Sequence, residues 1–172
     1  MKKIFTLIIA IFLISISTSF AEYPYYLDFK YVLNESEAGK KAQNELKNKL
    51  NNGMKSLNNK EKVIKEEEKK IIQQKKIISQ EEYKKKVTDL RKKVSTLQND
   101  RSKLLSSIAD ERSKARVQLL KNLNPIVKEY MVEKQIRMVL DKKDLILADE
   151  ALDITDEIIK RLNKKIKTIK IN

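Results

Sequence analysis

The clearest pattern in the sequence is a heptad repeat between residues 83 and 108. Apolar side chains recur at alternating steps of four and three residues, as the core of a coiled coil requires. Only Arg101 interrupts the apolar series, whose positions are Tyr83, Val87, Leu90, Val94, Leu97, Arg101, Leu104 and Ile108. The pattern predicts a long helix that packs against a partner helix.

A second heptad repeat, with fewer apolar residues at its core positions, precedes this one in the sequence. Its apolar residues stand seven apart, and charged residues occupy the core positions between most of them. With about one strong apolar layer per heptad, little area is buried per residue, so we expect an arm that bends and opens locally. The apolar positions are Leu50, Leu57, Ile64, Ile71 and Ile78, and the charged ones are Glu61, Glu68 and Lys75.

A helix start separates the two repeats. In Ser79-Gln80-Glu81-Glu82, the serine and the last glutamate have the spacing of a capping box. If the chain reverses there, Ile78 faces Tyr83, and stepping back by heptads brings the other apolar layers together and Glu61 near Arg101. This predicts an antiparallel helical hairpin over residues 37–122, with its turn near 79–81. One uninterrupted helix of twice the length is the alternative, because no Gly or Pro marks the turn.

The flanking segments have a different character. Short apolar runs at residues 25–33 and 138–148 indicate strands, and residues 141–144 interrupt the second run as a hairpin turn would. Asn124-Pro125 predicts a bend near the base of the returning helix. Asp153 is placed to cap a short terminal helix. We therefore expect residues 22–36 to hold the first strand of a head, and residues 123–172 to hold the return helix, a β-hairpin and the C-terminal helix.

A small sheet of this kind has open edges, which proteins normally pair or cover. Oligomerisation through the head is therefore expected. The fold class is mainly α with a small β head, from which a long coiled-coil hairpin projects. The residues expected in the oligomerisation head are Leu27, Phe29, Val139, Leu140, Leu145, Ile146 and Leu147.

The first 21 residues have the three parts of a signal peptide. Lys2 and Lys3 precede an apolar run from Ile4 to Ile16, and small residues at Ser19 and Ala21 suit a signal peptidase. An uncleaved anchor is the alternative, but the run is shorter than the ~20 residues that span a bilayer. We predict cleavage after Ala21 and export, without a lipid anchor, because the chain has no cysteine.

Composition narrows the classes of function. The chain contains no histidine and no cysteine, so the usual metal ligands and the common acid–base side chain are missing. We expect neither an enzyme nor a cofactor. The net charge is +14, and 24 lysines and arginines face only 11 acidic residues between Lys40 and Lys121. The predicted arm is therefore strongly basic.

Two segments carry a family resemblance. VLNESEAGKKAQNEL (residues 32–46) and DKKDLILADEALDITDEIIKRLNK (residues 141–164), around a lysine-rich helical middle, resemble the Skp/OmpH periplasmic chaperones. The resemblance implies a homotrimer whose β-rich heads form a shared trimerisation body, while three hairpins surround a cavity. It also implies an ATP-independent holdase that keeps unfolded outer-membrane β-barrel proteins from aggregating before insertion.

Candidate client contacts lie near the predicted arm tip. A basic cavity attracts acidic clients over about 8–10 Å at moderate salt, and scattered apolar side chains add weak contacts. At any single position, solvation of a charge or packing in the hairpin core is the alternative. The candidates are Ile71, Ile72, Ile77, Ile78, Tyr83, Lys84, Lys85, Lys86, Arg91, Lys92 and Lys93.

Other partners and roles fit parts of the same pattern. The resemblance admits an anionic membrane surface or lipopolysaccharide as a partner, to which we assign no residues. A coiled-coil spacer of the cell envelope would use the same heptads. The positive charge of the arm would also suit nucleic-acid binding. The predicted signal peptide and the near-absence of aromatic residues in the arm argue against this role, so we expect no specific nucleic acid as a partner.

Overall fold

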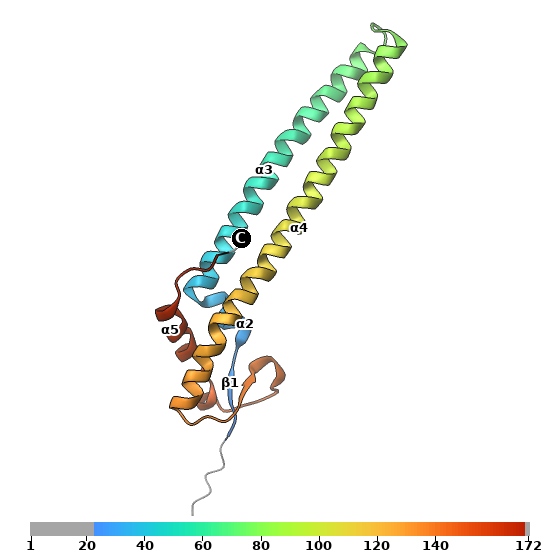
Figure 1. The fold of residues 1–172 in the computed structure, drawn as a ribbon. Helices are drawn as coiled ribbons and strands as arrows, with labels where there is room; N and C mark the ends of the chain where they lie inside the picture. Colours follow the sequence, from blue (N-terminus) through green and yellow to red (C-terminus); the bar gives the residue numbers. More distant parts are fainter. Residues whose placement is uncertain (1–22, 171–172) are drawn as a thin grey trace, which may run out of the picture.

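The structure, a computed structural model, describes residues 23–170 and consists of a small head with one long arm (Figure 1). The predicted leader and its cleavage after Ala21 lie outside the described residues. The arm is a helical hairpin of α3 (Glu37–Gln74) and α4 (Gln80–Glu133), which run side by side away from the head. At 1.5 Å per residue, the 38 residues of α3 extend about 57 Å. The predicted mainly helical class and projecting hairpin are confirmed.

The head combines both ends of the chain. Around the base of α4 it contains β1 (Tyr25–Leu27), α2 (Phe29–Glu35), β2 (Val139–Asp141), the 3-10 turns η1 (Lys142–Asp144) and η2 (Glu150–Leu152), and α5 (Thr155–Lys165). Its buried core draws on β1, α2, α4 and α5, so the terminal segments close over the base of the arm. The fully or nearly buried members are Leu27, Val32, Leu123, Ile126, Val127, Ile154, Ile158 and Leu162.

The expected strand over residues 25–33 is only three residues long. Asp28 ends it, because its carboxylate accepts a hydrogen bond from the amide of Tyr31 at 2.8 Å and caps α2. Phe29, Val32 and Leu33 then follow a helical spacing and face the interior. The prediction of a strand is therefore wrong for the second half of this segment, which forms α2.

The expected β-hairpin of residues 138–148 is also wrong. β2 pairs with β1 in parallel, in the register Tyr25 to Val139, and residues 145–147 form no strand. The carboxylate of Asp141 accepts from the amide of Lys143, which starts a 3-10 turn instead of a tight hairpin. The opposite edge of β1 is met at Asp153, through an isolated bridge to Tyr26.

Pro125 lies inside α4, which continues past it to Glu133, so the bend expected at Asn124-Pro125 stays a prediction. The predicted cap of the terminal helix needs a correction of one residue. Asp153 precedes the cap position of α5, which Ile154 occupies, but its carboxylate still accepts from the amide and hydroxyl of Thr155. Burial opposes ionisation of Asp153, yet these hydrogen bonds together with Lys142 hold its pKa below the usual value.

Candidate functional site

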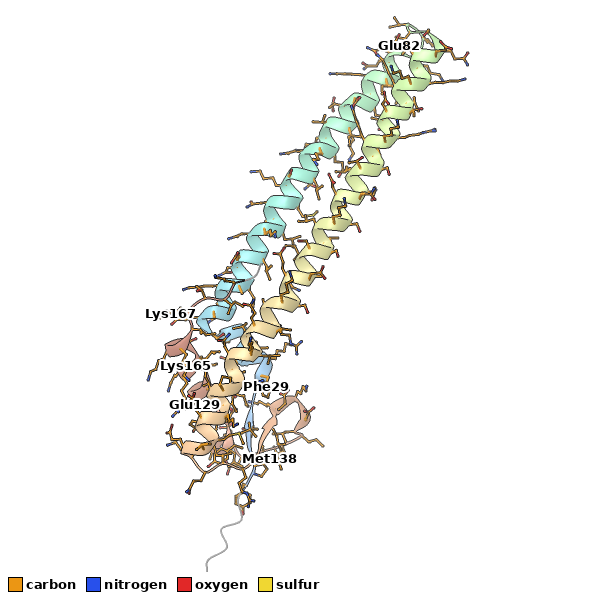
Figure 2. All side chains as sticks on the ribbon, viewed as in Figure 1. Phe29, Glu82, Glu129, Met138, Lys165 and Lys167 are labelled. Carbon is orange, nitrogen blue, oxygen red and sulfur yellow. The ribbon has the colours of Figure 1, made fainter. Side chains whose placement is uncertain are left out.

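The arm tip is built by a five-residue turn between the two long helices. α3 ends at Gln74 and α4 begins at Gln80, so the turn lies directly before the position expected from the sequence. The hydroxyl of Ser79 accepts from the amide of Glu82 at 3.2 Å, which is one half of the predicted capping box. The side chain of Glu82 instead pairs with Lys86, at 3.4 Å between the charged atoms. Figure 2 shows Glu82 at the far end of the arm.

A pocket of about 440 Å³ opens between the helices next to this turn. Its presence follows from the thin heptad repeat of α3. In the register of the hairpin, Glu68 stands opposite Val94, and its charged side chain does not fill an apolar layer. The pocket is lined by Glu68, Ile71, Ile72, Tyr83, Val87, Leu90, Arg91 and Val94.

The apolar residues predicted for client contact divide into two groups at the tip. Ile71 is buried between the helices, and Ile78 and Tyr83 are half-buried. Ile72 and Ile77 are 60% and 82% exposed. The first group therefore holds the hairpin together, whereas the second presents large apolar side chains to solvent.

The predicted basic residues divide in the same way. Lys93 bridges the helices through both carboxylate oxygens of Glu67, at 2.6 and 2.7 Å, and Lys86 donates to Gln74 at 2.8 Å. Within residues 23–170, no ion pair engages the remaining four. These exposed cations are Lys84, Lys85, Arg91 and Lys92.

Ion pairs across the hairpin fix its register. Arg101 pairs with Glu61 at 3.2 Å, as predicted from the heptads, and Lys60 pairs with Asp100 at 2.7 Å. Lys65 and then Arg101 hold the pKa of Glu61 below its usual value. Lys60 does the same for the pKa of Asp100. The arm thus uses some of its charge for internal pairing and leaves the rest exposed.

The residues predicted for the oligomerisation head differ in how far they are buried. Leu27 is fully buried in the head of its own chain, and Phe29 and Val139 pack against the same core. Leu140 and Leu145 are half-buried. Ile146 and Leu147 are almost completely exposed, at 105% and 92% of the reference area. Of the residues predicted for the oligomerisation head, the two most exposed therefore lie on the segment after η1.

The sequence matches the family described as outer membrane protein (OmpH-like) over residues 25–162, which includes the whole arm and nearly all of the head. The chain belongs to the OmpH-like family. This agrees with the resemblance seen in its two terminal segments.

A solved structure supports the same fold for this OmpH-like chain. It is described as a candidate outer membrane chaperone (OmpH-like) from Caulobacter crescentus CB15, and it superposes with a TM-score of 0.80 at 21% identity. The match covers 86% of this chain and 89% of the other. No curated protein matched the sequence. Among the described residues, no helix has the length and apolar character needed to cross a bilayer.

Proposed function

We propose that this OmpH-like protein is an ATP-independent holdase of the periplasm, which binds unfolded outer-membrane β-barrel proteins and prevents their aggregation before insertion. The arm tip carries the proposal. It combines an open pocket, two exposed isoleucines and four cations that form no ion pair within residues 23–170, on a helical pair that projects far from the head. These groups offer many weak contacts, which suit clients of varied sequence.

The chemistry of the tip favours an extended acidic or amphipathic chain over a folded partner. Ile72 and Ile77 each offer apolar area that is exposed to solvent. Lys84, Lys85 and Lys92 supply charge that attracts anionic segments over about a Debye length. Release needs no nucleotide in this scheme, because a client that folds into the membrane removes its own apolar segments from the tip.

The head supports self-association, and we propose a homotrimer. Ile146 and Leu147 are exposed next to a two-stranded sheet, and Met138 before β2 is also exposed. Figure 2 shows Met138 near the lower end of the head, away from the arm. Burial of this apolar segment between heads would cover the open side of the sheet and place several arms around one cavity.

Export to the periplasm completes the proposal. Residues 1–21 act as the signal peptide, with cleavage after Ala21. The mature protein then works without a membrane anchor, and an anionic membrane surface or lipopolysaccharide is an additional partner of its basic arm.

An aggregation assay tests the holdase. An outer-membrane barrel protein is diluted from urea into buffer with a stoichiometric amount of the purified protein, and turbidity is followed with time. The holdase keeps the barrel protein in solution, whereas a coiled-coil spacer gives the same turbidity as buffer alone. Native mass spectrometry of residues 22–172 tests the trimer, and a stable monomer overturns the shared head and the cavity.

A further inference from the structure

The chain does not end with α5 but turns back toward the arm. The amide of Ile166 donates to the carbonyl of Leu162 at 2.8 Å, and the backbone then becomes extended at Ile166, with φ −137° and ψ 134°. Figure 1 shows the C-terminal segment rising from α5 beside the lower part of α3. We call residues 166–170 the strap.

The strap has an apolar side and a charged side. Ile166 and Ile169 are half-buried, whereas Lys167, Thr168 and Lys170 are exposed. In Figure 2, Lys167 points away from the helices. Such a division is typical of a segment that lies on a surface of its own chain and presents its polar residues to water.

Ile169 packs against two apolar clusters that join the helices at the base of the arm. The lower cluster also contacts Ile166, which in addition reaches the core of the head. The lower cluster contains Leu33, Ala38 and Leu119, and the upper one contains Ala42, Leu46, Ile108 and Ala115. One side chain of the strap therefore touches layers contributed by both α3 and α4.

At the base of the arm, the interface between α3 and α4 contains small side chains. Ala38, Ala42 and Ala115 stand at core positions where leucine or isoleucine would fill the space between two helices. Alanine side chains bury little area, so a two-helix interface of this composition is weak without a third apolar layer. Ile169 supplies part of that layer.

α5 fastens the start of the strap to both helices. Asn163 accepts from the amide of Glu37, the first residue of α3, at 2.8 Å. Lys165 pairs with Glu129 near the end of α4 at 2.7 Å, and both residues are visible at the contact between α5 and α4 in Figure 2. The strap therefore extends from a fixed point on the head.

We propose that the strap clamps α3 to α4 at the base of the arm and confines opening of the hairpin to its outer part. The strap lies beyond residues 25–162, over which the sequence matches the family. Above the strap, the hairpin relies on its thin apolar repeat. Below that level, the third layer makes separation of the helices costlier. This device acts in the free protein and does not depend on client binding.

Hydrogen exchange measured by mass spectrometry tests the clamp on the purified full chain. Ile169→Ala removes the contact with both arm clusters and leaves Ile166 in the head core. We expect amides of residues 38–50 and 104–119 to exchange about tenfold faster, because without the Ile169 side chain local opening there exposes less apolar area and costs less free energy. Residues 71–94 should keep their exchange rates. A chain that ends after Lys167 should reproduce the effect.

The matched control is Lys167→Ala/Lys170→Ala, which alters only exposed residues of the strap and should leave exchange unchanged. Unchanged exchange at the base in both Ile169→Ala and the shortened chain overturns the clamp. An equal increase along the whole arm also overturns it, because the strap would then contribute only general stability. Either result leaves the aggregation assay unaffected, so the clamp and the holdase fail separately.

Discussion

Glu61 and Arg101 form an ion pair across the hairpin, with 3.2 Å between Oε2 and Nη2. The pair replaces an apolar layer of the coiled coil with two opposite charges. Both side chains are about one-third exposed, and within the described chain the Nε atom of Arg101 is buried without a hydrogen-bond partner. The layer therefore specifies register at some cost in stability, as polar residues in coiled-coil cores often do.

Replacement of both charges by leucine should stabilise the arm. Glu61→Leu/Arg101→Leu restores an apolar layer and removes the unsatisfied Nε, and we expect a gain of about 1 kcal/mol in the free energy of unfolding. Thermal unfolding followed by circular dichroism measures it. Glu61→Leu alone is the control, since it leaves Arg101 without its partner and should be less stable than the double variant. Equal stability of the two variants would contradict this account.

The two glycines of α3 should respond differently to alanine. A Cβ atom at Gly39 would lie 1.8 Å from the backbone carbonyl oxygen of Leu33, which cannot move without breaking the corner between α2 and α3. We expect Gly39→Ala to lower the free energy of unfolding by about 3 kcal/mol. Denaturant unfolding monitored by circular dichroism gives the value.

Gly53→Ala is the matched comparison within the same helix. Its Cβ atom would meet the methyl groups of Leu104 at 2.6–2.7 Å, and these can rotate away. The gain in helix propensity, about 1 kcal/mol, offsets the adjustment. We expect a change within about 1 kcal/mol of zero. A loss as large as that of Gly39→Ala would show that Leu104 is held rigidly.

Acid should loosen the contact between α5 and α4. Arg161 hydrogen-bonds to Glu133 at 2.6 Å and holds the pKa of that carboxyl below its ordinary value of 4.5. A lowered folded-state pKa stabilises the fold above the unfolded-state value, and this contribution is lost as the pH falls through the folded-state pKa. Thermal unfolding between pH 7 and pH 3 should show the loss below about pH 4.5. Glu133→Gln should flatten that part of the profile, and an unchanged profile would contradict this role.

The exposed isoleucines of the arm tip should matter for clients and not for folding. Ile72→Ser/Ile77→Ser removes apolar area that is already in water, so we expect thermal stability to change little and client affinity to fall about tenfold. Fluorescence titration with an unfolded barrel protein measures the affinity. Val63→Ser is the control, because Val63 is equally exposed but lies outside the tip. An equal loss for the control would place client contact along the whole arm.

The arm could be predicted from the sequence because its contacts are local and periodic. Heptad spacing brings Glu61 opposite Arg101 once the turn is placed, and Ser79 marks where α4 begins. The pocket at the tip could also have been anticipated, since Glu68 occupies a core position opposite Val94. That consequence of the pattern was missed.

The head could not be predicted to the same extent because its pairing is distant and its signals are short. Asp28 looks like an ordinary polar residue within an apolar run until its capping of α2 is known. Nothing near β2 indicates that its partner is β1, or that the pairing is parallel. The role of Ile169 depends on alanines far away in the sequence, which a local pattern does not reveal.

The parallel pairing of Tyr25 with Val139 also constrains the order in which the molecule assembles. The hairpin can form from its turn toward the head, because the first contacts join residues that are close in sequence. Contacts of this kind form rapidly. β1 must wait until almost the entire chain has emerged, because its partner strand and α5 come last. Pulse-labelled hydrogen exchange during refolding should therefore protect the outer arm before the head. A newly made chain would thus hold a formed arm before it completes the head through which we propose that it joins other copies of itself.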